Sequence, residues 1–120
     1  MTDRKEIIKQ YKQTVQPMGV YQIRNLVNGK IFVSSSLNLR GIKNRFEFKV
    51  ASNFMVNPEL QNDYEKYGHN NFTLEILDEL DPKEDPAYDY KDDLKVLEEM
   101  WIEKLQPFGE KGYNIPKKKF

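Results

Sequence analysis

A β-hairpin signal near the start of the chain constrains the fold more than any other feature. Residues 20–26 and 30–35 are rich in β-branched and aromatic side chains, and Asn28-Gly29 lies between them. This dipeptide is the strongest short signal for a two-residue hairpin turn, because both turn positions need a positive φ. The sequence therefore predicts two antiparallel strands in direct succession.

A two-residue turn at Asn28-Gly29 also fixes the register of the hairpin. It would place Tyr21 opposite Ser36 and Ile23 opposite Ser34. Side chains alternate between the two faces of a strand, so one face can be assigned from the register alone. The side chains expected on that face are Tyr21, Ile23, Asn25, Phe32 and Ser34.

The remaining pattern alternates helices with one more strand. Residues 72–77 alternate apolar and polar side chains and predict a third strand. Asn57-Pro58 is a typical helix start and Gly68 a typical stop. Together these segments indicate an α+β domain with a three-stranded sheet. The predicted helices are Arg4–Lys12, about Leu37–Val50, the segment from Pro58 to Gly68, and a helix around Leu94–Ile102.

Composition narrows the class of protein. The chain has 120 residues, no cysteine and no apolar run long enough to span a membrane. Its first twelve residues are charged, which argues against a signal peptide, so we expect a cytoplasmic protein. Residues 1–50 hold ten Lys/Arg against three Asp/Glu, whereas residues 51–110 hold five against sixteen. This uneven distribution of charge is compatible with a basic surface that binds phosphates. It is equally compatible with solvated surfaces of mixed charge that bind no partner.

Glu98 stands out in the last predicted helix. On a helical wheel it falls inside the apolar stripe, one turn after Leu94 and one turn before Ile102. A carboxylate in that position must be paired, protonated or bound to a metal, because burying it bare is costly. Its neighbour Glu99 should point to solvent. His69, the single histidine, lies in a polar stretch and is also expected to be exposed.

Several short motifs, taken in order, resemble the GIY-YIG nuclease family. They are Gly19-Val20-Tyr21, the run from Asn28 to Ser34, Lys66-Tyr67-Gly68 followed by Phe72, Glu98 with Trp101-Ile102, and Gly112-Tyr113-Asn114. The resemblance covers roughly residues 18–115. It implies a three-stranded antiparallel sheet flanked by helices, preceded here by an extra N-terminal helix, and metal-dependent hydrolysis of DNA phosphodiesters.

The resemblance also implies roles for particular residues. Tyr21 matches the family's first tyrosine, which helps to activate the attacking water. Glu98 matches its metal-binding glutamate, which would hold Mg²⁺ or Mn²⁺, and Asn114 matches the asparagine of the closing motif. The family's catalytic arginine falls on Ile42, and Arg45, about 60° further round that helix, is the best substitute.

Other departures from the family weaken the predicted site. Phe32 stands where the second tyrosine is expected, Ser34 where a glycine is expected, and Phe46 and Met55 where histidines are frequent. Serine nucleophile chemistry is disfavoured, because Ser34–Ser36 lacks a histidine partner. The leading interpretation is a divalent-metal-dependent DNA endonuclease with a partly degenerate site.

The alternative is an inactive nuclease-fold module that binds nucleic acid, RNA included, or a protein partner. A protein partner would dock on the acidic linker, residues 81–93, and on the helix that carries Glu98. We expect residues 1–17 to form a helix and linker, residues 18–115 the functional domain and residues 116–120 a basic tail. The oligomeric state is left open.

Overall fold

The structure is a computed structural model that describes residues 16–48, 57–85 and 87–116. The predicted helix Arg4–Lys12 and the lysine tail lie outside the described residues. In chain order the elements are β1 (Gly19–Asn25), β2 (Ile31–Ser36), α2 (Leu39–Glu47), α3 (Pro58–Tyr67), a short 3₁₀ helix η1 (His69–Asn71), β3 (Phe72–Glu79) and α4 (Lys91–Leu105).

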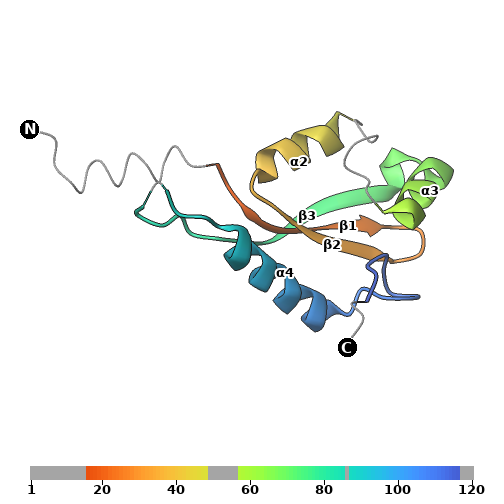
Figure 1. The fold of residues 1–120 in the computed structure, drawn as a ribbon. Coiled ribbons are helices and arrows are strands. Elements are labelled where there is room, and N and C mark those ends of the chain that lie inside the picture. Colours follow the sequence, from red (N-terminus) through yellow and green to blue (C-terminus); the bar gives the residue numbers. More distant parts are fainter. Residues whose placement is uncertain (1–15, 49–56, 86, 117–120) are drawn as a thin grey trace, which may run out of the picture.

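The three strands form one antiparallel sheet in the order β2-β1-β3. In Figure 1 the strands run through the middle of the molecule, with α2 above them, α4 below them, and α3 beside the turn that joins β1 to β2. α4 packs against β2 and β1. The predicted α+β class with a three-stranded antiparallel sheet is therefore confirmed.

The predicted hairpin register is wrong by two residues. Tyr21 pairs with Ser34, not Ser36, and Ile23 pairs with Phe32. The loop has four residues, 26–29, because the amide of Asn25 donates to the carbonyl of Lys30 and the amide of Gly29 donates to the carbonyl of Asn25, each at 2.8 Å. β1 therefore leaves the ladder two residues earlier than predicted, while Lys30 remains the first paired residue on the other side. A shift of two preserves the alternation, and the predicted face keeps its members.

One continuous apolar core joins that face to the helices. Tyr21, Ile23 and Phe32 pack with Phe72 of β3 and with side chains from α2, α3 and the C-terminal loop. On the other face of the sheet, Val20 and Val33 are also buried, as expected for a central strand and its neighbour. The helical and loop members of the core are Leu39, Phe46, Leu60 and Tyr113.

Local sequence explains how the helices begin and where strands approach closely. The side chain of Asn57 accepts a hydrogen bond from the amide of Leu60, and Pro58 follows it, so α3 begins as predicted. α4 begins at Lys91, inside the segment expected to be an acidic linker.

Gly19 is required in β1, since a Cβ there would collide with the carbonyl oxygen of Asp78. No described helix is long and apolar enough to cross a membrane.

Candidate active site

Tyr21 places a hydroxyl inside the core, beside the side chain of Ser34. The residue is 4% exposed, and Ser34 lies directly opposite it in the β1–β2 ladder. Burial raises the pKa of Tyr21 above its usual value, a hydrogen bond from Ser34 acts in the other direction, and the negative charge of Glu98 raises it further. The charge of Glu98, on α4, is thus one of the causes that raise the pKa of Tyr21, after burial.

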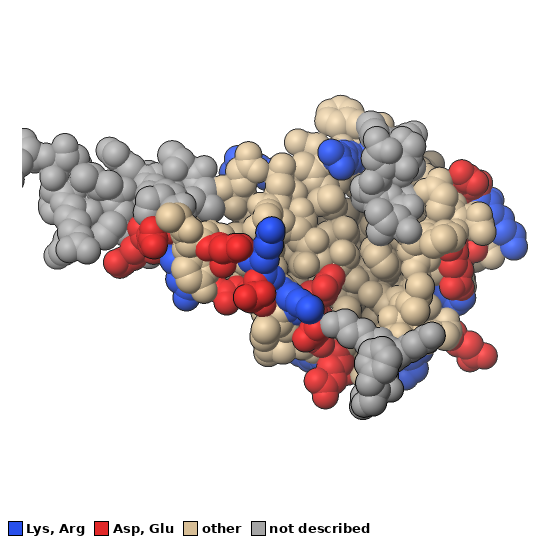
Figure 2. Space-filling view, in the orientation of Figure 1, with Lys and Arg blue, Asp and Glu red and all other residues tan. Residues whose placement is uncertain are grey.

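Glu98 lies on the half-buried side of α4, in agreement with its position in the apolar stripe. Leu94 is buried, and Leu97, Trp101 and Ile102 are half-buried on the same helix. Figure 2 shows that acidic side chains gather over the connection from β3 to α4 and along α4 itself. Glu99 was expected to be exposed, but it is half-buried, because the side of α4 that meets the protein is broader than the predicted stripe.

Asn114 is held against the backbone of β2. Its side-chain carbonyl accepts from the amide of Val33 at 2.9 Å, and its side-chain amide donates to the carbonyl of Val33 at 2.8 Å. The oxygen and the nitrogen of the Asn114 side-chain amide are thus both bonded to Val33, the residue before Ser34. This geometry gives Asn114 a supporting position beside the β2 backbone that carries Ser34.

Arg45 remains at the surface of α2. The side chain is exposed, whereas its neighbour Phe46 is buried in the core cluster. No described hydrogen bond or ion pair joins Arg45 to Tyr21. Of the predicted site residues, Arg45 is the one that the described contacts do not connect to the others.

His69 is not the exposed residue that the sequence suggested. It is half-buried in η1, with its Nδ1 2.6 Å from the Tyr64 hydroxyl and its ring centroid 4.8 Å from that of Phe46. The polar sequence around it gave no sign of these contacts, which come from α2 and α3. His69 therefore packs beside one of the positions where the family frequently has a histidine.

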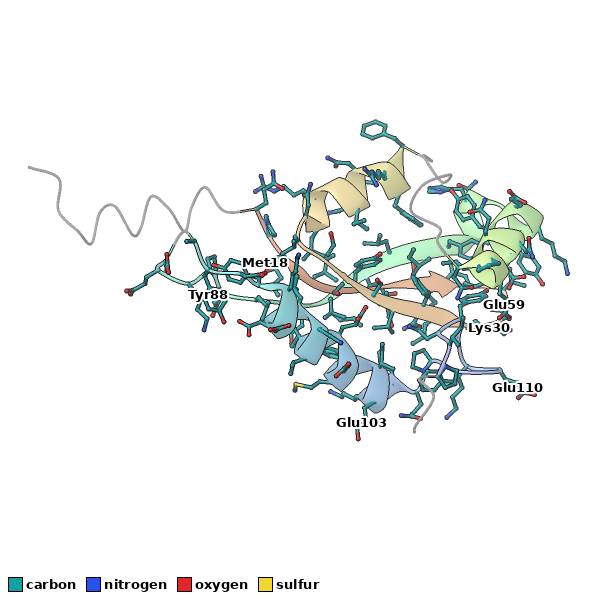
Figure 3. All side chains as sticks on the ribbon, in the orientation of Figure 1. Met18, Lys30, Glu59, Tyr88, Glu103 and Glu110 are labelled. Atoms are coloured by element: carbon teal, nitrogen blue, oxygen red, sulfur yellow. The ribbon has the colours of Figure 1, made fainter. Side chains whose placement is uncertain are left out.

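A buried polar network lies where the C-terminal loop meets α3. The hydroxyl of Tyr113 donates to Asp63 Oδ2 at 2.7 Å and accepts from Asn25 at 3.0 Å. Burial first, and then the bond to Asp63, raise the pKa of Tyr113 to about 12. Figure 3 shows Lys30 and Glu59 side by side in this region, and their charged atoms are 2.7 Å apart.

A metal centre with several protein ligands is absent from the described part of the chain. Among residues 16–48, 57–85 and 87–116, no three His, Cys, Asp or Glu side chains are grouped so that they could hold an ion. The candidate site is therefore one carboxylate, one buried tyrosine hydroxyl and one serine. Ser34 was not predicted as a site residue, since the wrong register paired it with Ile23.

Comparison with known proteins finds solved structures with a similar fold. No protein-family model and no curated protein sequence matches the chain. Solved structures that resemble it include the catalytic domain of the homing endonuclease I-TevI, with a TM-score of 0.63, 29% identity, and coverage of 83% of this chain and 99% of that domain. A glutamate-to-alanine variant of the I-TevI domain gives a TM-score of 0.64 and 28% identity, and covers 88% of this chain and 99% of its own.

Proposed function

Because this chain is related to the GIY-YIG homing endonucleases in fold and sequence, we propose that it is an endonuclease-type domain that hydrolyses DNA phosphodiester bonds with the help of a divalent cation. One observation carries the proposal: the chain matches the catalytic domain of the homing endonuclease I-TevI over 83% of its length, at 29% identity and a TM-score of 0.63. A shared site for two motif residues is supported by the charge of Glu98, which is one of the causes that raise the pKa of Tyr21.

A lone carboxylate fits Mg²⁺ or Mn²⁺ better than zinc. Magnesium keeps several waters and is bound through one or two carboxylates together with substrate phosphates, whereas zinc sites use several nitrogen or sulfur ligands. Glu98 would be the protein ligand, and DNA would complete the coordination. A bound cation would lower the pKa of a water molecule and offset negative charge on the phosphate.

Tyr21 would orient the attacking water rather than take its proton. Its pKa is raised from a value near 10, so the hydroxyl remains protonated at neutral pH. A neutral phenol donates one hydrogen bond and also accepts, which is sufficient to fix the position of a water molecule. Such positioning lowers the entropic part of the barrier.

Arg45 would offset charge on the phosphate, and Asn114 would keep β2 in place beside the site. A phosphate that gains charge in the transition state is stabilised by a positioned cation. Arg45 is exposed on α2 and has a long side chain, so substrate binding could order it. Asn114 acts through Val33 and would not touch the substrate.

The proposal also covers which residues form the functional unit and where in the cell the protein is found. Residues 18–115 would form the functional unit, and a chain trimmed to these residues should keep whatever cleavage the full chain has. A cytoplasmic location, expected from the sequence, is tested by fractionation of cells that express the protein. Loss of cleavage from a trimmed chain that still folds would contradict the proposed boundaries.

The decisive experiment compares two glutamates of α4. The purified full chain is incubated with supercoiled DNA and Mg²⁺ or Mn²⁺, and nicking is measured for the wild type, Glu98→Gln and Glu103→Gln. Glu103 is exposed on the same helix and serves as the matched control. We expect Glu98→Gln to lose about 100-fold or more in rate and Glu103→Gln to match the wild type. Equal nicking by wild type and Glu98→Gln would rule out the metal role.

A second function is favoured by the packing around Tyr21. Phe32 and Phe46, which stand at positions where the family carries polar site residues, are buried in the same core cluster as Tyr21. A site filled with apolar side chains suits a nuclease fold that binds nucleic acid without cutting it. This function predicts binding to DNA or RNA that weakens steeply with salt, and no nicking by the wild type in either metal ion.

A further inference from the structure

β3 pairs with β1 along one side and has no strand from the described residues along its other side. Beside its first residue, the amide of Leu26 donates to the carbonyl of Asn71, so the backbone of Asn71 faces β1. In an antiparallel pair, residues that bond the neighbouring strand alternate with residues that face away from it. The backbone groups of β3 that face away from β1 therefore belong to Phe72, Leu74 and Ile76.

An open hollow lies along the second half of this edge. Its lining residues follow one another in the chain, so they come from both faces of the strand, and the hollow runs along the strand edge. The register between β1 and β3 shifts at Leu77, an extra residue that bends the strand. The side chain of Ile76 is 40% exposed there. The lining residues are Ile76, Leu77, Asp78, Glu79 and Asp81.

The hollow is acidic. Three of its five lining residues carry carboxylates and none is a lysine or an arginine, so its charge is not balanced from within. Trp101 Nε1 donates to Asp78 Oδ2 at 3.2 Å, which holds that side chain against α4. Glu79 and Asp81 are exposed, and neither makes an ion pair with another described residue. These two carboxylates are in a position to meet positive charges of a partner.

The charge decides which partner fits this edge. Two copies of the chain paired along β3 would bring like charges together, because the strand carries Glu75, Asp78 and Glu79 and neither lysine nor arginine. Nucleic acid would bring its phosphates to the same carboxylates. An extended polypeptide with basic side chains would satisfy both the outward backbone groups and the charges.

We propose that the acidic edge of β3, residues 72–81, is a docking site for an extended segment of a partner protein that carries lysine or arginine. The segment adds one more strand to the sheet, bonding the outward backbone groups of Leu74 and Ile76, and its basic side chains lie over Glu79 and Asp81. None of the residues proposed for DNA cleavage lines the hollow. The docking site and the cleavage site can therefore be lost independently.

Backbone pairing is tested by amide hydrogen exchange. The full chain, labelled with ¹⁵N, is mixed at low salt with a short capped peptide of alternating lysine and valine. At a peptide concentration about ten times its Kd, exchange of the Leu74 and Ile76 amides should slow about tenfold. The control is the same peptide with every backbone amide N-methylated, which keeps the charges and cannot donate to β3. Unchanged exchange at Leu74 and Ile76, or equal slowing by the N-methylated peptide, would overturn the proposal.

The charge requirement is tested by two double variants with the same net charge. Glu79→Gln with Asp81→Asn should weaken binding of the peptide about fivefold, because two exposed ion pairs are lost. Glu103→Gln with Glu110→Gln should stay within about twofold of the wild type. Both control residues are exposed, and Figure 3 shows them well away from Met18, which bonds Leu80 at the end of β3. Equal weakening in the two double variants would show general attraction and would overturn the site.

Two further mixtures test the choice of partner. A short DNA duplex in place of the peptide should leave exchange at Leu74 and Ile76 unchanged, and so should a tenfold increase in the concentration of the chain alone. Slower exchange with DNA would identify a nucleic-acid surface. Slower exchange with rising chain concentration would identify a second copy as the occupant. Either result would overturn the assignment of a basic protein segment to this edge.

Discussion

The hydroxyl of Tyr113 donates to the carboxylate of Asp63 at 2.7 Å and so ties the C-terminal loop to α3. The same oxygen accepts from Asn25, which is fully buried at the end of β1. Three segments that are remote in sequence meet at one phenol oxygen. Because buried polar groups are costly when unpaired, this oxygen is a sensitive point for stability.

Removing that oxygen should destabilise the fold. In Tyr113→Phe, the side-chain amide of Asn25 loses its partner in a buried position, so we expect the free energy of unfolding to fall by about 1–3 kcal/mol. Tyr88→Phe is the control, because the Tyr88 hydroxyl donates to Asp93 at the exposed surface. Its effect should stay within about 0.5 kcal/mol. Urea unfolding measures both, and equal losses would contradict the special role of Tyr113.

Alkaline pH should weaken the fold through the same residue. The folded pKa of Tyr113 is raised to about 12, so the folded chain keeps the proton at a pH where the unfolded chain has begun to release it. The stabilisation that comes from this pKa difference is fully present below pH ~10 and is lost as the pH rises towards ~12. We expect a loss on the order of 1–2 kcal/mol, reduced by solvent screening at the half-exposed Asp63.

The check is urea unfolding between pH 9 and 11.5 for the wild type and Tyr113→Phe. The variant should show a smaller decline, and what remains should come from tyrosines such as Tyr21 and Tyr64, whose pKa values are also raised. Identical pH profiles for the two proteins would show that Tyr113 does not carry the effect.

Arg45 and Arg40 should differ in their importance for cleavage. Both are exposed on α2, but they point to different sides of the helix. Arg45→Ala should lower the nicking rate by about 10- to 100-fold, because a cation near the phosphate would be lost. Arg40→Ala should remain within about twofold of the wild type. If Arg40→Ala reduces nicking as much as Arg45→Ala does, general attraction of DNA explains both.

Asn114 should matter for stability first and for cleavage second. Asn114→Ala leaves the backbone of the buried residue Val33 without two hydrogen bonds, which should cost about 1–2 kcal/mol. Asn70→Ala, an exposed change in η1, is the control and should cost less than about 0.5 kcal/mol. Thermal unfolding measures both, and an unchanged Tm in Asn114→Ala would contradict the supporting role.

Most elements of this fold could be predicted from local sequence, but their exact pairing could not. Asn28-Gly29 correctly indicated a hairpin, yet the loop has four residues, since the Asn25 carbonyl and side chain bind the amides of Gly29 and Val27. Propensity alone does not distinguish these two loops. Alternation has a period of two, so the face of Tyr21 was right even though its partner was wrong.

The candidate site, too, could be predicted only in part from local sequence. Glu98 was recognisable because a carboxylate in an apolar stripe breaks a local pattern, and the structure puts it on the half-buried side of α4. Ser34 and His69 break no local pattern. Their roles depend on Tyr21 and on Tyr64 and Phe46, which neighbouring elements bring to them. Contacts of this kind arise only when the elements are assembled.

β2 is the outermost strand on its side of the sheet, and an outermost strand offers unpaired backbone groups to any other chain. Here the C-terminal loop occupies those groups: Ile31 donates to the carbonyl of Lys111 and accepts from the amide of Tyr113, while Asn114 takes both groups of Val33. The loop thus blocks strand addition along the first half of β2. A variant without this loop would expose unpaired backbone N–H and C=O groups along that half of β2. We expect such a variant to self-associate through β2 before its chemistry changes.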